Sequence, residues 1–138
     1  MSRNTVLIVD PDDAARSALR ATLEGEGYAV VESGAPDAAF AMINRSEISL
    51  VVTELYLPVK SETCLLRAIR QSSALRRTKV LAYTRHTRKR DRAWAITEGA
   101  NGYVLKVNGS ARLLEVVARM GRSATRKRRQ PGPKKESD

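Results

Sequence analysis

The sequence predicts an α/β fold: a single domain with a doubly wound, five-stranded parallel sheet covered by helices on both faces. Five short apolar segments rich in β-branched residues alternate with five segments of helical period. The central apolar segment, residues 48–53, has the composition of a strand buried on both faces. At 138 residues, of which 42% are hydrophobic, the chain is long enough to bury one core.

The first half of the chain contains two strand–helix units. Residues 5–9 form a strand that ends at Asp10, and Asp12 or Asp13 can cap a helix that runs to about Glu24. The second unit consists of a strand at 28–31 and a helix that opens at 33–36, with Pro36 near its first turn.

The second half continues the alternation with three further units. Its expected segments are the central strand ending at Glu54, a helix at 61–70, a strand at 79–83 ending at Thr84, a helix at 88–98, a strand at 102–105 ending at Lys106, and a helix at 110–120. In the helix at 88–98 we expect Ala93, Ile96 and Ala100 on the inner side and Trp94 facing away from them.

Charge is distributed unevenly along the chain, which has a formal net charge of +10. Residues 122–138 contain seven Lys or Arg and two acidic residues. The first 121 residues contain eighteen Lys or Arg and thirteen acidic residues. From Gly121 onward there is no apolar periodicity, and Pro131 would break a helix. We therefore expect a folded domain at 1–121 and a disordered basic tail at 122–138.

Several classes of protein are disfavoured by composition. Cys64 is the only cysteine, which excludes an internal disulfide and a cysteine-based zinc site. No apolar run reaches membrane-spanning length and no signal peptide is evident, so a soluble cytoplasmic chain without membrane contact is expected. No nucleophile–base pair or glycine-rich phosphate loop is recognisable, and we do not expect an enzyme.

Polar side chains follow four of the expected strands. They are Asp10, Glu54, Thr84 and Lys106. Because the carboxyl ends of parallel strands meet at one edge of the sheet, where ligands of open α/β folds bind, these four side chains should converge there. The sequence thus predicts a site made of two carboxylates, a hydroxyl and an ammonium.

These motifs, taken together, resemble the CheY-like receiver domain of bacterial two-component response regulators. The likeness covers residues 5–120, and it rests on Leu-Ile-Val-Asp, Leu-Val-Val-Thr-Glu-Leu-Tyr-Leu-Pro, Leu-Ala-Tyr-Thr and Glu-Gly-Ala-Asn-Gly-Tyr-Val-Leu-Lys in that order. It implies a flavodoxin-like sheet and phosphoryl transfer from a histidine kinase to the residue at position 54, assisted by magnesium. It also implies that Thr84 and Lys106 contact the phosphoryl group and that Tyr103 is the aromatic switch residue.

The acceptor and its surroundings depart from the family pattern at four positions. Glu54 replaces the acceptor aspartate, and Pro11 replaces the second member of the acidic pair, which leaves Asp10, with Asp12 nearby, as the acidic pocket. Arg85 and Val107 replace a small residue and a proline. We expect no catalytic residue, no metal ligand set, and magnesium binding that is weak at most.

Two stretches offer contact surfaces. Trp94, with Arg88 and Lys89 on the same expected helix, can bind a partner, and the face formed by the fourth helix, fifth strand and fifth helix can form a homodimer. The tail contains the basic run Arg126, Lys127, Arg128 and Arg129, which can bind nucleic acid without sequence preference.

Our first functional interpretation is a stand-alone pseudo-receiver that works through protein contacts with a histidine kinase or a downstream effector. The alternative is a nucleic-acid-associated regulatory protein that binds through the tail and the fourth-helix patch. A flavin protein of the same topology is disfavoured, because Asp10, Asp12 and Asp13 would repel a flavin phosphate bound after the first strand.

Overall fold

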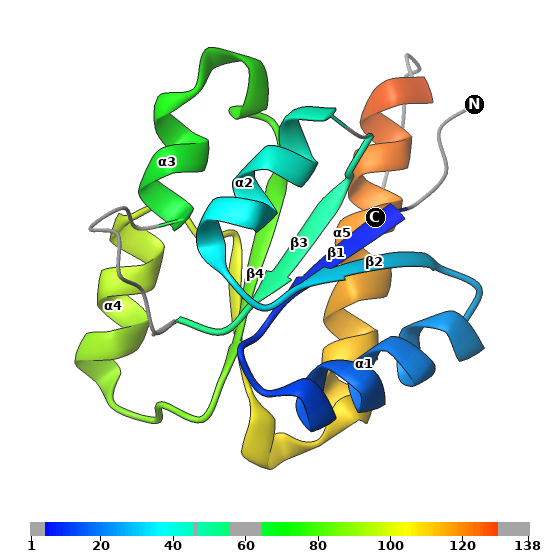
Figure 1. Cartoon of the computed structure of the whole chain (residues 1–138), viewed down its shortest axis with the longest axis vertical. Helices are drawn as coiled ribbons and strands as arrows, with labels where there is room; N and C mark the ends of the chain where they lie inside the picture. The colour runs from blue at the N-terminus through cyan, green and yellow to red at the C-terminus, as the bar shows by residue number, and fades with distance from the viewer. Residues whose placement is uncertain (1–4, 46, 56–64, 130–138) are drawn as a thin grey trace.

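The computed structural model describes residues 5–45, 47–55 and 65–129, with side chains as far as Met120. Strands and helices alternate throughout this part of the chain (Figure 1). In chain order the elements are β1 (Thr5–Val9), α1 (Asp13–Gly25), β2 (Ala29–Ser33), α2 (Pro36–Arg45), β3 (Leu50–Thr53), α3 (Leu65–Gln71), the 3-10 turn η1 (Ser73–Leu75), β4 (Lys79–Thr84), α4 (Lys89–Thr97), β5 (Gly102–Leu105), the 3-10 turn η2 (Lys106–Asn108) and α5 (Ser110–Arg129).

The five strands form one parallel sheet in the order β2-β1-β3-β4-β5, which confirms the predicted fold class. The central position of β3 agrees with its composition, since all four of its residues are buried. Val9 pairs with Thr53, and Thr84 pairs with Leu105. The residues that follow these strands therefore begin at the same edge of the sheet.

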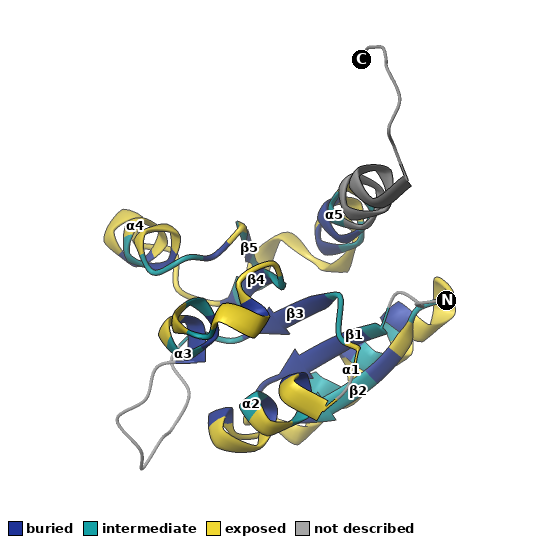
Figure 2. Ribbon diagram, turned by 90° about the horizontal axis from the view of Figure 1, so that it is seen from above, coloured by how far each residue is buried: buried dark blue, intermediate teal, exposed yellow. Residues whose placement is uncertain are grey.

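Each face of the sheet has its own core (Figure 2). On one face α1 and α5 pack on the strands, with Leu23 and Leu113 fully buried. On the other face α2, α3 and α4 pack, with Ile69 and Ala95 fully buried. Two separate apolar layers are what a doubly wound sheet requires, since its strands have no polar face.

The polar side of α1 is joined to β2 by ion pairs. Arg16 and Arg20 both bind Glu32, at 3.0 and 2.7 Å. Hydrogen bonds from Arg20 and then Arg16 hold the pKa of the Glu32 carboxyl below its ordinary value. Arg16 also donates a 2.7 Å hydrogen bond to the backbone carbonyl of Asp10, so this clamp positions the chain where it leaves β1.

The predicted inner face of α4 is confirmed for Ala100, which is buried just beyond the helix, but is wrong for Ala93 and Ile96. Asp91 and Ala95 are the buried residues of this helix, while Ala93 is exposed and Ile96 is 47% exposed. Trp94 is half-buried and packs against the second core. Residues 93–96 are consecutive and apolar, so they occupy every side of the helix, and their pattern alone does not select a face.

The predicted end of the last helix at Met120 is also wrong, because α5 continues to Arg129. Residues 122–129 contain good helix formers and no glycine or proline, so nothing in their backbone ends the helix before Pro131. α5 thus extends into the segment 122–129 that we assigned to the basic tail, and residues 130–138 lie outside the described part. So do residues 61–64 of the helix predicted at 61–70. None of the helices in the described ranges has the length and apolar character of a membrane span.

Candidate functional site

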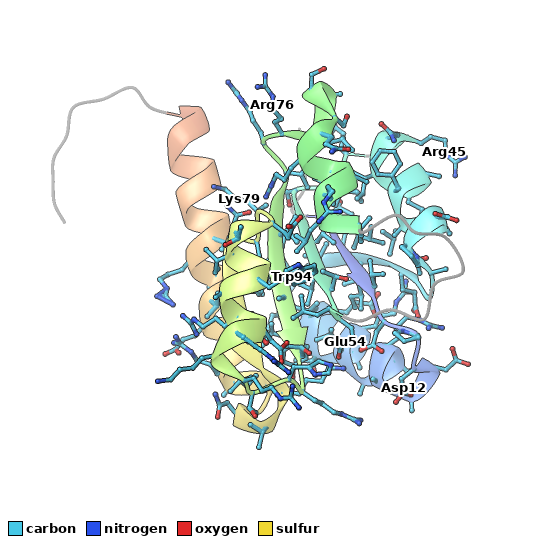
Figure 3. The ribbon with its side chains drawn as sticks, turned by 90° about the vertical axis from the view of Figure 1, so that its left-hand side faces the viewer. Asp12, Arg45, Glu54, Arg76, Lys79 and Trp94 are labelled. Atoms are coloured by element: carbon cyan, nitrogen blue, oxygen red, sulfur yellow. The ribbon has the colours of Figure 1, made fainter. Side chains whose placement is uncertain are left out.

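The carboxyl ends of β1, β3, β4 and β5 bring Asp10, Glu54, Thr84 and Lys106 together. Asp10 and Glu54 follow residues that are paired across β1 and β3, so the two carboxylates start side by side. In Figure 3, Glu54 lies at the same end of the molecule as Asp12, whereas Arg76 and Lys79 lie at the opposite end. All four strand-end side chains belong to one cluster of contacts, and two of them, Asp10 and Thr84, are buried.

Lys106 lies between the two carboxylates. Its Nζ is 2.7 Å from Oδ2 of Asp10 and 3.2 Å from Oε1 of Glu54, and it also lies 5.8 Å from the centre of the Tyr83 ring. Burial lowers the pKa of Lys106, but the hydrogen bond and charge of Asp10, followed by the charge of Glu54, outweigh burial and raise it. The ammonium is therefore a fixed positive charge that offsets one of the two carboxylate charges of the site.

Glu54 has contacts at both carboxylate oxygens. Oε1 faces Lys106, and Oε2 accepts hydrogen bonds from the Thr84 hydroxyl at 2.5 Å and from the Leu55 backbone N–H at 2.8 Å. The backbone N–H of Glu54 donates to the Val9 carbonyl at 2.9 Å, which ties the residue to β1. The glutamate thus reaches the hydroxyl and the ammonium that the family likeness assigns to phosphoryl oxygens.

The carboxylate oxygens nearest to the strand ends are engaged by groups of the protein in this structure. Asp10 Oδ1 accepts a hydrogen bond from the Asp12 N–H at 2.9 Å, and Asp10 Oδ2 binds Lys106. The exposed carboxylate of Asp12 caps α1 by accepting from the N–H groups of Ala14 and Ala15, and Pro11 has no donor atom in its side chain. Among the described residues no group of three or more His, Cys, Asp or Glu side chains is arranged to hold a metal. The Lys106 ammonium thus contacts the carboxylate oxygens of Asp10 and Glu54 that a metal ion would require.

His86 joins the cluster through its backbone. Its N–H donates to the Thr84 hydroxyl at 3.2 Å, and its carbonyl accepts a 2.7 Å hydrogen bond from the hydroxyl of Tyr103. Tyr103 is half-buried against the second core, and burial, followed by the charges of Asp91 and Glu54, raises its pKa. Almost any residue type can make these backbone hydrogen bonds, so the sequence alone could not reveal them.

The predicted contact residues lie apart from this cluster. Arg88 and Lys89 are exposed at the start of α4, and Trp94 lies one turn further on. The run Arg126, Lys127, Arg128 and Arg129 forms the end of α5, and its side chains are outside the described set.

A family model described as the response regulator receiver domain matches residues 6–118. The chain belongs to this family. The receiver is 26% identical over 117 residues to a 14.6 kDa protein of Leptolyngbya boryana, covering 85% of this chain and 89% of that protein. It is 30% identical over 103 residues to the transcriptional regulatory protein CpxR of Escherichia coli, covering 75% of this chain but only 43% of CpxR.

Solved receivers have the same fold. The chemotaxis protein CheY4 of Vibrio cholerae superposes with a TM-score of 0.79 at 24% identity, covering 86% of this chain and 99% of that one. The receiver domain of the sensor histidine kinase PA1611 of Pseudomonas aeruginosa, which has a magnesium ion in its active-site cleft, superposes with a TM-score of 0.77 at 24% identity, covering 87% and 99%. At this identity the comparison establishes the fold and leaves the chemistry to the residues of this chain.

Proposed function

We propose that this receiver is a pseudo-receiver: Glu54 sets its signalling state in place of a phosphorylated aspartate, and it acts by binding other two-component proteins. The observation that supports this most directly is the double engagement of the Glu54 carboxylate, by the Thr84 hydroxyl and by the Lys106 ammonium. Receivers signal within two-component systems, so a histidine kinase or a downstream effector is the expected partner.

Side-chain length provides the physical reason. Glutamate extends one methylene further than aspartate, about 1.5 Å, which is the direction in which a phosphoryl group would extend from the strand end. The negative charge is already present and needs no transfer reaction. The Thr84 hydroxyl binds Glu54 and also accepts the His86 N–H, so the charge at position 54 supports the segment that leads into α4.

Affinity capture with the full chain as bait tests the proposal. Wild type and Glu54→Gln differ by one charge and have almost the same shape, so a partner that responds to the charge is recovered by wild type and lost by the variant. Addition of acetyl phosphate with magnesium should leave the wild-type capture unchanged. Equal recovery by the two baits, or capture that requires the phosphodonor, would contradict the proposal.

We further propose that the same module forms a homodimer through the face of α4, β5 and α5. Ile96 on α4 is 47% exposed, and the Arg92 guanidinium lies 5.8 Å from the centre of the Tyr103 ring on neighbouring β5. On this face an exposed apolar side chain therefore lies near a charged group. Interfaces between proteins combine apolar and charged residues in the same way.

The second candidate function is binding of nucleic acid. The observation that favours it is the length of α5, which brings all four cations of the run 126–129 into one helix. Clustered Lys and Arg bind phosphate backbones and release condensed counterions, without reading base sequence. Binding to duplex DNA at several salt concentrations tests this candidate.

A further inference from the structure

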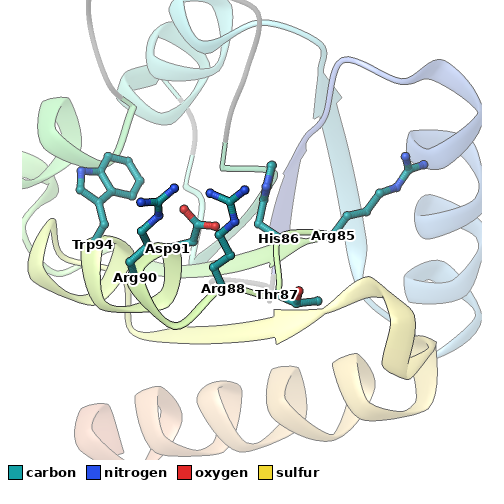
Figure 4. A pocket seen from close by; sticks show the side chains of 7 residues that line it. All are labelled: Arg85, His86, Thr87, Arg88, Arg90, Asp91 and Trp94. Carbon is teal, nitrogen blue, oxygen red and sulfur yellow. The ribbon is translucent and has the colours of Figure 1, made fainter.

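The structure contains a pocket that the site at the strand ends does not use. It lies where β4 passes into α4, has a volume of about 710 Å³, and is lined by Arg85, His86, Thr87, Arg88, Arg90, Asp91 and Trp94 (Figure 4). We refer to it as the α4 pocket. Its size is within the range of about 300–1,000 Å³ that is typical of small-molecule sites.

The α4 pocket is strongly positive. No ion pair joins Arg85, Arg88 or Arg90 to an acidic residue within the part of the chain that the structure describes. Elsewhere on the surface Arg16, Arg20 and Arg112 are paired with carboxylates. Within the described residues, the positive charge of these three guanidinium groups is thus not neutralised by an ion pair.

The backbone adds to this charge. The pocket adjoins the first turn of α4, whose N-cap residue, Arg88, makes no side-chain capping hydrogen bond. The N-terminus of a helix carries a partial positive charge that favours anions. The one acid in the first turn, Asp91, is 8% exposed and lies between Arg88 and Arg90 in Figure 4.

One wall of the pocket is aromatic. Trp94 is half-buried, packs against the second core, and lies beyond Arg90 in Figure 4. An indole held in place by the core is a platform on which a planar ring can stack. The pocket therefore combines guanidinium groups, which bind phosphate through two parallel hydrogen bonds, with a surface for a base.

We propose that the α4 pocket binds a nucleoside phosphate, with Arg88 and Arg90 on the phosphates and Trp94 against the base. Inorganic phosphate would leave most of the volume unfilled and the indole unused. An acidic peptide would use the arginines but not the aromatic wall. A nucleotide uses both features and fits the volume.

The pocket is connected to the site at the strand ends through His86, which lines it. The His86 N–H binds the Thr84 hydroxyl that holds Glu54, and its carbonyl binds Tyr103. A ligand that moves this segment acts on the group that positions Glu54. Binding itself does not rest on the proposed function: it is tested with Arg88 and Arg90 variants, whereas the proposed function is tested with Glu54 variants.

Tryptophan fluorescence of the full chain provides a direct measurement, because Trp94 is the only tryptophan. The probes are ATP and GTP without metal, inorganic triphosphate, and guanosine. We expect saturable quenching by at least one of the two nucleotides, binding about tenfold weaker for triphosphate, which lacks the base, and little response to guanosine, which lacks the phosphates.

Arg88→Gln and Arg90→Gln should each weaken nucleotide binding about tenfold, as expected for loss of a charge-assisted hydrogen bond. Both side chains are exposed, so these variants should fold normally, which circular dichroism checks. Arg112→Gln is the matched control: it removes one charge on α5, where Arg112 pairs with Glu115, and should bind like wild type. Equal affinity for triphosphate and nucleotide, equal weakening by the control, or no saturable response to ATP or GTP would overturn the proposal.

Discussion

The hydroxyl of Thr84, at the end of β4, donates a 2.5 Å hydrogen bond to Oε2 of Glu54, which follows the neighbouring strand β3. Because the other oxygen of this carboxylate faces Lys106, Glu54 is held from two neighbouring strands at once. This double engagement of the carboxylate is the contact on which the proposed pseudo-receiver function rests. The predictions below follow from this contact and from the charges around it.

Wild-type protein should not be phosphorylated by acetyl phosphate with magnesium. Both oxygens of Glu54 have partners, and Asp10 binds Lys106 rather than presenting free oxygens to a metal. Intact-mass spectrometry checks this, with Pro11→Asp/Glu54→Asp as the variant that should become competent. Addition of one phosphoryl group to wild type at Glu54 would refute the prediction.

Pro11→Asp and Glu54→Asp should restore magnesium binding cooperatively. The first change supplies a carboxylate at an exposed position next to Asp10, and the second shortens the side chain that now reaches Thr84 and Lys106. Two ligands of one ion are coupled, so the double variant should exceed the sum of the single changes by about 1 kcal/mol or more. Isothermal titration with magnesium measures this, and additive weak effects would count against a shared site.

Thr84→Val should loosen the segment between β4 and α4. Valine has nearly the shape of threonine but cannot donate to Glu54 or accept the His86 N–H. We expect the free energy of unfolding to fall by about 1 kcal/mol, because the part-buried Oε2 of Glu54 loses one of its two hydrogen-bond donors and keeps only the Leu55 N–H. Amide exchange of His86, measured by NMR, should accelerate. Thr22→Val, which affects only an exposed hydroxyl bonded to the Ala18 carbonyl within α1, is the control.

Lys106→Met should lower the free energy of unfolding at neutral pH by about 3 kcal/mol, as expected when one partner of a largely buried ion pair is removed. The pKa of Lys106 is raised in the folded protein by Asp10 and Glu54, against the lowering effect of burial. Its stabilising contribution is therefore complete below the ordinary value of 10.5 and is lost as pH rises through the raised folded value.

Urea denaturation of wild type and Lys106→Met at a series of pH values measures this contribution. The difference between the two proteins should be constant at neutral pH and should shrink at alkaline pH, where neutral lysine no longer pairs with the carboxylates. A difference that stays constant through the alkaline range would show that Lys106 stabilises the fold by packing alone.

Replacement of Arg126, Lys127, Arg128 and Arg129 by glutamine should weaken binding to duplex DNA at low salt. Each phosphate contact contributes about 0.9 to the slope of log affinity against log salt, so four lost contacts should reduce that slope by about 3 to 4. The matched control replaces Arg85, Arg88, Lys89 and Arg90, the same number of charges. If this control loses as much affinity as the first variant, the α4 surface rather than the end of α5 binds DNA.

The sequence was sufficient for the strand–helix order and for the four strand-end residues of the site. The central strands are buried on both faces and are therefore mostly apolar, so the charged or polar residue that closes each apolar run lies at or just after the end of its strand. In a parallel sheet these ends share one edge, which places Asp10, Glu54, Thr84 and Lys106 together without further information. The sequence predicted the end of α5 less well, because residues with high helix propensity continue beyond the core-facing residues until Pro131.

Only the tertiary structure decided which side of α4 is buried and how the site is connected. Four consecutive apolar residues in α4 point in all directions, and packing on the second core selected Ala95 and buried Asp91. The position of Lys106 between two carboxylates and the two backbone hydrogen bonds of His86 join residues from different strands. Such contacts depend on distances between segments that are remote in the chain, and local sequence patterns carry no information about those distances.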